Sequence, residues 1–206
     1  MEIPTTSVET VTVVRPLKVI ALICFIIAAI LLIVCLASTT WLKAGGFHQG
    51  LFQECLDKGK HIAMPSPPEP GHCKSVELRG GRRAYIQAVA ALLIIAGILT
   101  VACVILTAVG LKVNNSSRKY LFYRCALYIA IVAVILEAIS LIVFPVCFYS
   151  ELNELAVGYR WDFDWAYGLA WGALIFTVGA ALLLICDKEH EEVYYKEKTV
   201  MRPIAQ

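Results

Sequence analysis

"LKVIALICFIIAAILLIVCLASTT", residues 17–40, carries one charged side chain, Lys18, near its start and is otherwise almost entirely apolar. A helix needs about 20 apolar residues to cross the hydrocarbon core of a bilayer, which is about 30 Å thick. The stretch therefore predicts a transmembrane helix. Three later segments meet the same requirement, so we expect four spans, at residues 17–40, 85–111, 121–148 and 165–186.

The composition of the whole chain agrees with this interpretation. Of its 206 residues, 59% are hydrophobic and 17% are charged, whereas soluble domains are about 45–50% apolar and about 25% charged. The apolar run of the first span, Val19–Ala37, exceeds the roughly 7–15 residues of a cleaved signal core, and no clear small-residue cleavage site follows it. We therefore expect this span to stay in the membrane.

Four spans place both termini on one side of the membrane. Lys and Arg residues are slightly more numerous on the side of the termini, which favours a cytosolic position for both ends. The expected organisation, apart from the spans, is a cytosolic N-terminal tail at 1–16, a first extracellular loop at 41–84, a cytosolic loop at 112–120, a second extracellular loop at 149–164 and a cytosolic C-terminal tail at 187–206.

Cysteine placement supports the same orientation. Cys55 and Cys73 share the first loop, whereas the other six cysteines lie in or at the edges of the spans. Disulfides persist outside the cytosol, and closing this loop would stabilise the fold by about 3 kcal/mol. We expect a Cys55–Cys73 disulfide. Zinc binding with His61 and His72 is an alternative, although the spacing matches no common site, and two free thiols are another.

The second loop predicts a short strand. In "RWDFDW", residues 160–165, aromatic and charged residues alternate, which is typical of a half-buried strand. Asp164 is a suitable N-cap for the fourth span. The strand needs partners, and the first loop offers them around residues 41–47 and 50–55. We expect a small antiparallel sheet built from both loops.

Several residues inside the spans are candidates for special roles. Gly168, Gly172 and Gly179 form a small-residue pattern that predicts close helix packing, inside the bundle or against another copy. Glu137 is the one acidic residue deep in a span, so we expect it to face the bundle interior, as a single hydrogen-bonded acid rather than part of an ion relay. Pro145 should kink its helix or end its regular turns.

The sequence contains none of the common catalytic patterns, such as HExxH, a Walker loop or GxSxG. We therefore expect a protein that is not an enzyme, with no catalytic residue, metal, cofactor or small-molecule substrate. Nothing in the sequence predicts nucleic-acid binding. Membrane lipid is an expected partner.

Taken together, Trp41, Gly50-Leu51-Phe52, Cys55 and Cys73, with Arg82 or Arg83 before the second span, resemble the signature of the claudin and peripheral myelin protein superfamily. "SLIVFPVCFYSE", residues 140–151, and "FDWAYGLAWGALIF", residues 163–176, are similar to the branch that contains transmembrane protein forty-seven and the p53 apoptosis effector related to peripheral myelin protein. The resemblance covers roughly residues 15–195.

The resemblance implies an all-α membrane protein, a left-handed four-helix bundle with a small extracellular antiparallel sheet. We expect Gly50, Leu51 and Phe52 to pack one strand of that sheet down towards the bundle. It also implies a plasma-membrane protein that organises cell–cell junctions and adhesion, with junctional membrane proteins in cis or trans and cytosolic adaptors as partners. The alternatives are an auxiliary channel subunit and a regulator of cell death or growth.

The chain also departs from the family pattern, and its tail carries candidate modification sites. Phe52 replaces the usual Trp, and Glu137 stands where the branch has glutamine. Cys186, at the cytosolic boundary, is a candidate for palmitoylation. Tyr194 and Tyr195 are candidates for phosphorylation, the alternative being an unmodified, solvated tail.

Overall fold

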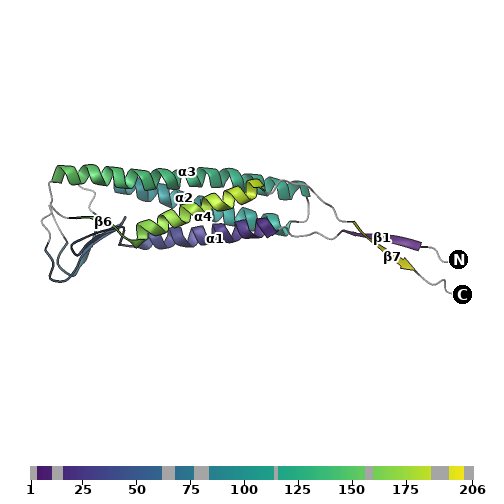
Figure 1. Cartoon of the computed structure of the whole chain (residues 1–206), viewed down its shortest axis with the longest axis horizontal. Coiled ribbons are helices and arrows are strands. Elements are labelled where there is room, and N and C mark those ends of the chain that lie inside the picture. The colour runs from purple at the N-terminus through teal and green to yellow at the C-terminus, as the bar shows by residue number, and fades with distance from the viewer. Residues whose placement is uncertain are drawn as a thin grey trace.

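The computed structural model describes residues 4–10, 16–61, 68–76, 84–113, 116–155, 160–186 and 195–201. Figure 1 shows a long helical bundle with a small sheet at one end and both chain termini at the other. In the following, the two ends are called the sheet end and the tail end. The fold therefore separates the two loops that carry the sheet from the two tails by the full length of the bundle.

Within the described residues, four helices are long and apolar enough to cross a membrane, as the sequence predicts. Pro16 begins the first helix, at a position where its missing N–H removes no helical hydrogen bond. Lys112 lies in the last turn of the second, where a positive charge is favoured. The helices are α1 (Pro16–Ala37), α2 (Ala84–Lys112), α3 (Ser116–Leu155) and α4 (Trp165–Cys186).

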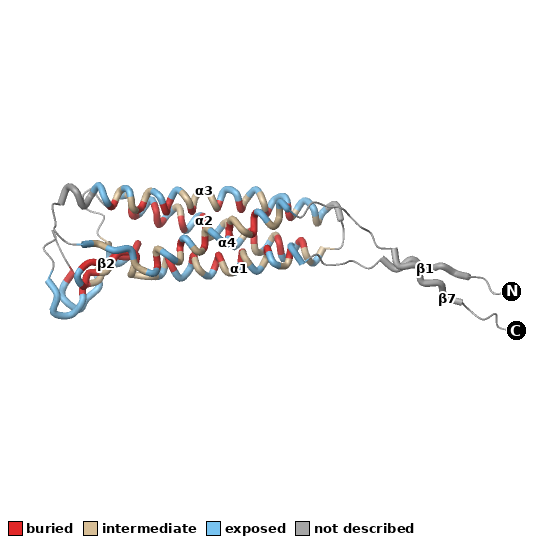
Figure 2. Tube along the Cα trace, viewed as in Figure 1, coloured by how far each residue is buried: buried red, intermediate tan, exposed pale blue. Residues whose placement is uncertain are grey.

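The helices pack through small residues and present bulky ones outward. On α4 the buried residues include Ala166, Ala170, Ala173 and Thr177, which recur every three or four positions and form one stripe. Isoleucines point away from the bundle on every helix, for example Ile175, which is 67% exposed. Figure 2 shows the resulting alternation of buried and exposed turns along each helix. This arrangement suits lipid as the solvent, because bulky apolar side chains gain nothing by leaving it and small ones let helices approach.

A five-stranded antiparallel sheet closes the sheet end, and its order in the described residues is β5-β4-β3-β2-β6. Phe163 pairs with Leu42, which confirms the predicted pairing of the second loop with the segment that follows Trp41. The strand from the second loop is two residues long, shorter than the alternating pattern predicts. The strands are β2 (Leu42–Ala44), β3 (Phe47–Gln49), β4 (Gln53–Leu56), β5 (Cys73–Ser75) and β6 (Asp162–Phe163).

A second, two-stranded sheet lies beyond the tail end. Strand β1 (Pro4–Thr10) pairs with β7 (Tyr195–Met201) in antiparallel register, with Thr10 opposite Tyr195. The two strands come from segments near opposite ends of the chain and extend away from the bundle (Figure 1). This pairing is not predicted from the sequence, which indicates only on which side of the membrane the tails lie.

The sequence predicts that Pro145 either kinks its helix or ends its regular turns. Helix α3 continues through Pro145 to Leu155, so the second expectation is wrong. Proline lacks an N–H, and the carbonyl four residues earlier, that of Leu141, therefore loses its helical donor. The hydroxyl of Tyr167 on α4 donates to that oxygen at 3.0 Å. The carbonyl oxygen that has no donor within α3 thus accepts a hydrogen bond from a side chain of α4.

Replacing Tyr167 by phenylalanine should lower the free energy of unfolding by about 1 kcal/mol, because the Leu141 carbonyl would lose its donor while the ring packing stays. Denaturant unfolding in detergent micelles measures the change. Tyr149, which lies on the same helix as Pro145 and is 67% exposed, provides the control: Tyr149→Phe should have almost no effect. Equal changes in the two variants would show that the Tyr167 hydroxyl is not needed.

Candidate functional site: the sheet end of the bundle

The sheet is joined to the bundle through Trp41, whose side chain is fully buried. Its indole N–H donates to the carbonyl oxygen of Cys35 at 2.7 Å. Helix α1 ends at Ala37, so this carbonyl belongs to the last turn, where backbone oxygens have no helical donor. The ring meets Phe144 of α3 and Tyr167 of α4 edge to face, with centroid distances of 5.1 and 5.9 Å. One side chain therefore connects the first strand segment with three helices.

Gly50 lies where two backbone segments touch. A Cβ atom at this position would be 2.6 Å from the carbonyl oxygen of Ser38 and 2.7 Å from the Cα atom of Thr39. Both atoms belong to the backbone that leads from α1 into the sheet, so a side chain here could not be accommodated by a rotamer change. Glycine is therefore required by close approach, and this requirement explains its place in the family signature.

Leu51 and Phe52, which lie between β3 and β4, differ in burial. Leu51 is 3% exposed and packs in the main core with Leu93 of α2, as expected. Phe52 is 48% exposed, so the expectation that all three residues from Gly50 pack down onto the bundle is wrong for Phe52. Leu51 occupies the buried position in the core with α2, and its neighbour Phe52 is left at the surface.

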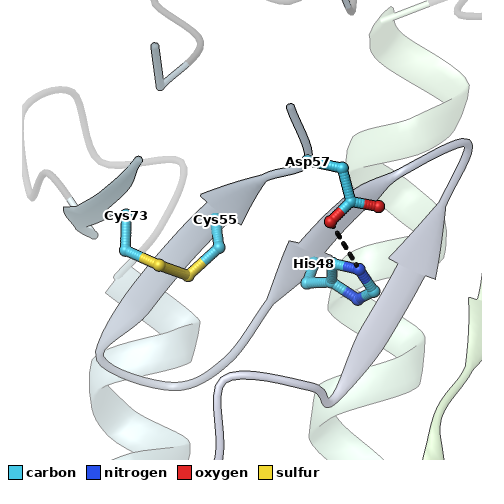
Figure 3. A network of polar contacts seen from close by, with 4 residues as sticks. All are labelled: His48, Cys55, Asp57 and Cys73. Carbon is cyan, nitrogen blue, oxygen red and sulfur yellow. Dashed lines mark ion pairs between the residues drawn. A yellow bond between two sulfur atoms is a disulfide. The ribbon is translucent and has the colours of Figure 1, made fainter. Parts of the chain in front are cut away.

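Cys55 and Cys73 form the predicted disulfide. The two residues are directly opposite each other on β4 and β5, so the bond ties the edge strand to the rest of the sheet (Figure 3). Because both sulfur atoms are used in this bond, neither cysteine serves as a zinc ligand or as a free thiol. The loop between the two strands is closed at its base by a covalent link.

The two faces of the sheet differ in chemistry. The face toward the bundle buries Leu42, Ala44, Phe47 and Leu56. The opposite face carries one row of cross-strand neighbours, which runs over all five strands through Asp162, Lys43, His48, Cys55 and Cys73. We call the face of the sheet that carries these five residues the outward face. Lys43 and Asp162, which are paired across β2 and β6, are exposed and have opposite charges.

A histidine–aspartate contact braces the turn after β4. The Nε2 atom of His48 lies 3.6 Å from Oδ1 of Asp57, as Figure 3 shows. Backbone bonds hold the same turn, with the amide of Asp57 donating to the carbonyl of Gly46 at 2.9 Å. The outward face is therefore held in shape at two places, by this contact and by the disulfide.

Aromatic rings connect the second loop to both the sheet and α3. Trp161 lies 5.7 Å from Phe47 of β3 and 5.2 Å from Phe148 of α3, edge to face in each case. Phe163 stacks on Tyr167 with 4.6 Å between ring centroids. These ring contacts join the second loop to the sheet and to α3 and α4.

Glu137 is fully buried between the helices, so the expectation that it faces the bundle interior is confirmed. Its Oε1 atom lies 3.3 Å from the hydroxyl of Thr177 on α4. The same hydroxyl lies 2.9 Å from the carbonyl oxygen of Ala173 and can donate to it. The carboxyl group therefore links α3 to α4, and the expectation that it is not part of an ion relay stays a prediction.

The glycines of α4 do not make the close contacts inside the bundle that their spacing predicts. A Cβ atom at Gly168 or Gly179 would meet no atom within 4 Å, and one at Gly172 would reach only Leu31, at 3.5 Å. The alanine stripe of α4 provides the close packing instead. Because glycine and alanine are both small, sequence spacing alone could not tell which stripe faces inward.

The remaining predicted residues lie at the edge of the described chain or outside it. Cys186 is the last residue of α4 and is exposed. Tyr195 is the first residue of β7. Arg82, Arg83 and Tyr194 lie outside the described residues. Their proposed roles, including modification of Cys186 and the tyrosines, stay predictions.

Sequence reasoning missed two residues that build the site, Phe144 and Tyr167. Both lie deep in apolar or aromatic stretches and match the general pattern of a span. The signal that could have found Tyr167 is Pro145, since a proline within a span predicts a donor nearby for the freed carbonyl. Phe144 carries no comparable signal, because its role is only to pack against Trp41.

Comparison with known proteins agrees with this geometry. A model of the PMP-22/EMP/MP20/Claudin family matches residues 16–184, which include the four long helices and the five-stranded sheet. One similar protein is "p53 apoptosis effector related to PMP-22" from Danio rerio, which is 40% identical over 119 residues. That alignment covers 56% of this chain and 60% of the relative's length. The resemblance expected from the sequence is confirmed.

Changing Trp41 in two steps should separate its hydrogen bond from its packing. Trp41→Phe keeps a ring but loses the bond to Cys35, so we expect the free energy of unfolding to fall by about 1 kcal/mol. Trp41→Ala should lower it by about 3–5 kcal/mol, because a cavity forms between three helices. Denaturant unfolding in micelles measures both, with Trp171→Phe, at a residue that is 40% exposed, as the control. A neutral Trp41→Phe variant would contradict the role of the N–H.

Gly50→Ala should destabilise the protein by about 1–3 kcal/mol, because the added methyl group overlaps backbone atoms that cannot move independently. The change should appear as a lower unfolding midpoint and as incomplete formation of the Cys55–Cys73 disulfide, detected by thiol labelling. Gly168→Ala, where the methyl group meets open space, is the matched control and should be neutral or slightly stabilising. The idea of an obligatory close approach fails if both variants behave like the parent.

Proposed function

Because the chain belongs to the PMP-22/EMP/MP20/Claudin family, we propose that it is a non-enzymatic four-span protein that organises cell–cell junctions and adhesion at the plasma membrane. The observation that carries the proposal is the outward face, a sheet surface fixed to the bundle by Trp41 and braced by a disulfide. A surface held at the end of a membrane-spanning bundle is suited to meet another protein and has no need of catalytic groups.

The proposed orientation places the sheet outside the cell and both termini in the cytosol. The Cys55–Cys73 disulfide supports it, since disulfides persist in the extracellular space and not in the cytosol. The termini lie at the opposite end of the bundle from that bond (Figure 1). With one end of the bundle outside the cell, the other faces the cytosol.

The proposed mechanism uses three surfaces. The outward face, with Lys43 and Asp162 exposed, contacts a junctional membrane protein of the neighbouring cell. The outer sides of the helices contact lipid and junctional proteins of the same membrane. The C-terminal segment recruits cytosolic adaptors, and modification of Cys186, Tyr194 or Tyr195 would adjust this step.

A second candidate function is the regulation of cell death or growth. It is favoured by the similarity to the relative whose name describes it as a p53 apoptosis effector. The two functions are compatible, because loss of cell contact and cell death can be linked in one tissue. The two functions differ in their demands on the outward face, since only the junctional role requires this face to contact another protein.

Localisation and orientation form the first test. A tagged chain in a polarised epithelium should concentrate at cell–cell contacts, and an antibody should reach a tag at either terminus only after the membrane is permeabilised. Deletion of the gene should lower adhesion strength or barrier resistance. A protein that stays away from contacts, with adhesion unchanged by its loss, would refute the junctional role.

Charge reversal on the outward face is the sharper test. Lys43→Glu should weaken contact with a neighbouring cell roughly fivefold, which corresponds to about 1 kcal/mol, because it replaces one charge of the proposed binding surface. Lys112→Glu, an exposed lysine at the tail end, is the matched control and should leave adhesion unchanged. Aggregation of suspended cells that express equal surface amounts measures the difference.

The same pair of variants separates the two candidate functions. If the protein acts only on cell death, caspase activity should rise equally in cells that express the parent, Lys43→Glu or Lys112→Glu, with no difference in aggregation. That result would sink the junctional proposal and leave the second candidate in place.

A further inference from the structure

Two exposed arginines, Arg118 and Arg124, lie near the start of α3 at the tail end of the bundle, where α2 ends and α3 begins (Figure 1). Both belong to the third segment that is apolar enough to cross a membrane. Leu121, which is 60% exposed, lies three residues from each, so the three side chains share one face of the helix. The arginines are therefore on the side of α3 that meets lipid, and not in the bundle interior.

Neither arginine forms an ion pair with a residue that the structure describes. No Asp or Glu occurs in residues 84–136, and Glu137 is about 20 Å from Arg124 along the helix axis. Arg124 lies 5.2 Å from the ring centroid of Tyr120 and donates a hydrogen bond to the hydroxyl of Tyr128, but both of these groups are neutral. The two positive charges therefore have no counter-ion in the described part of the chain.

The charges of these arginines are not explained by their own helix. The first turn of a helix carries a partial positive charge, which disfavours cations, and the first turn of α3 has no acidic residue that would offset Arg118. Lys112, by contrast, lies in the last turn of α2, where a cation is favoured. Positive residues are common at a cytosolic boundary, but this tendency does not require Arg124, which lies about two turns into α3 on its lipid side.

The spacing of the two arginines suits a lipid with two phosphate groups. A guanidinium group binds phosphate through two parallel hydrogen bonds. Arg118 and Arg124 are separated by about 9 Å along the helix axis. Arg124 is the deeper of the two in the membrane, at the level of the phosphate that joins a headgroup to its glycerol. Arg118 is further out, at the level of the headgroup itself.

We propose that Arg118 and Arg124 bind a phosphorylated phosphatidylinositol, with the diester phosphate on Arg124 and a ring phosphate on Arg118. In the orientation proposed above, on which this proposal rests, the tail end meets the cytosolic leaflet, which holds the anionic phosphatidylinositols. Phosphatidylcholine, phosphatidylethanolamine and phosphatidylserine fit less well, because each carries an ammonium group beyond its phosphate, and Arg118 would repel it.

Acidic side chains of the chain itself are the competing source of negative charge. Four of them lie in residues 187–192, outside the described residues. They fit less well than a lipid, because a carboxylate of a water-soluble segment would have to reach the lipid-facing side of α3 beside Leu121. Phospholipid phosphates already lie at that depth.

The experiment uses the purified full-length protein in phosphatidylcholine nanodiscs that contain an alkyne-tagged phosphatidylinositol bisphosphate with a photoreactive group near its headgroup. The parent should be labelled on peptides that include residues 118–128. Unlabelled phosphatidylinositol bisphosphate should compete about tenfold better than phosphatidylserine. Arg124→Gln and Arg118→Gln should each lower labelling about tenfold, because each loses charge-assisted hydrogen bonds to a phosphate. Both positions are exposed, and unchanged unfolding in denaturant would show that the variants fold like the parent.

Lys112→Gln is the matched control, because this exposed lysine lies at the same end of the bundle but on α2. At physiological ionic strength its labelling should stay within about twofold of the parent, since charges outside the site are screened. An equal loss in Lys112→Gln and Arg124→Gln would overturn the proposal in favour of a general attraction of anions, and so would equal competition by phosphatidylserine. Increased labelling after the four acidic residues in 187–192 are changed to their amides would assign the arginines to that segment instead. Nanodiscs expose both leaflets and contain no neighbouring cell, so a failure here is separate from a failure of the junctional role.

Discussion

The Trp41 side chain, through its hydrogen bond to the Cys35 carbonyl and its ring contacts with Phe144 and Tyr167, joins the larger sheet to the helical bundle. The strands of the larger sheet are two to four residues long, and so small a sheet is marginal without support. At one edge the disulfide supplies that support, and near the other edge Trp41 does. The same indole satisfies an unpaired carbonyl at the end of α1 and packs against α3 and α4. The contacts of Trp41 with these helices therefore set the orientation of the sheet relative to the bundle.

Inside the membrane, two departures of α3 from a regular apolar helix are matched by a partner on α4. Pro145 leaves a carbonyl without a donor, and Tyr167 of α4 supplies one. Glu137 places a carboxyl group in the bundle interior, and Thr177 of α4 contacts it. Such compensation is required because no water is present to satisfy polar groups in the hydrocarbon. Helix α4 thus supplies a partner for each of these two groups of α3, in addition to its own alanine packing.

The molecule offers two surfaces with different chemistry. At the sheet end, the outward face is polar, charged and braced, which suits a protein partner that approaches through water. Along the bundle, the helices present bulky apolar side chains such as Ile175, which suits contact with lipid within the membrane. Phe52, next to β4, is 48% exposed, so its ring is not part of the core.

The number and place of the spans, the disulfide and the pairing of the two loops all followed from the sequence, because they depend on local composition and on which cysteines share a loop. The direction of Phe52, the role of Tyr167 and the choice between the glycine and alanine stripes of α4 did not. These features depend on which side of an element meets a neighbour, and glycine and alanine, or two adjacent aromatic residues, satisfy the same local pattern. Only the packed arrangement of α1, α3 and α4 around Trp41 decides which side that is, because contacts between segments distant in the chain are made by shape and by the pairing of buried polar groups such as the Leu141 carbonyl.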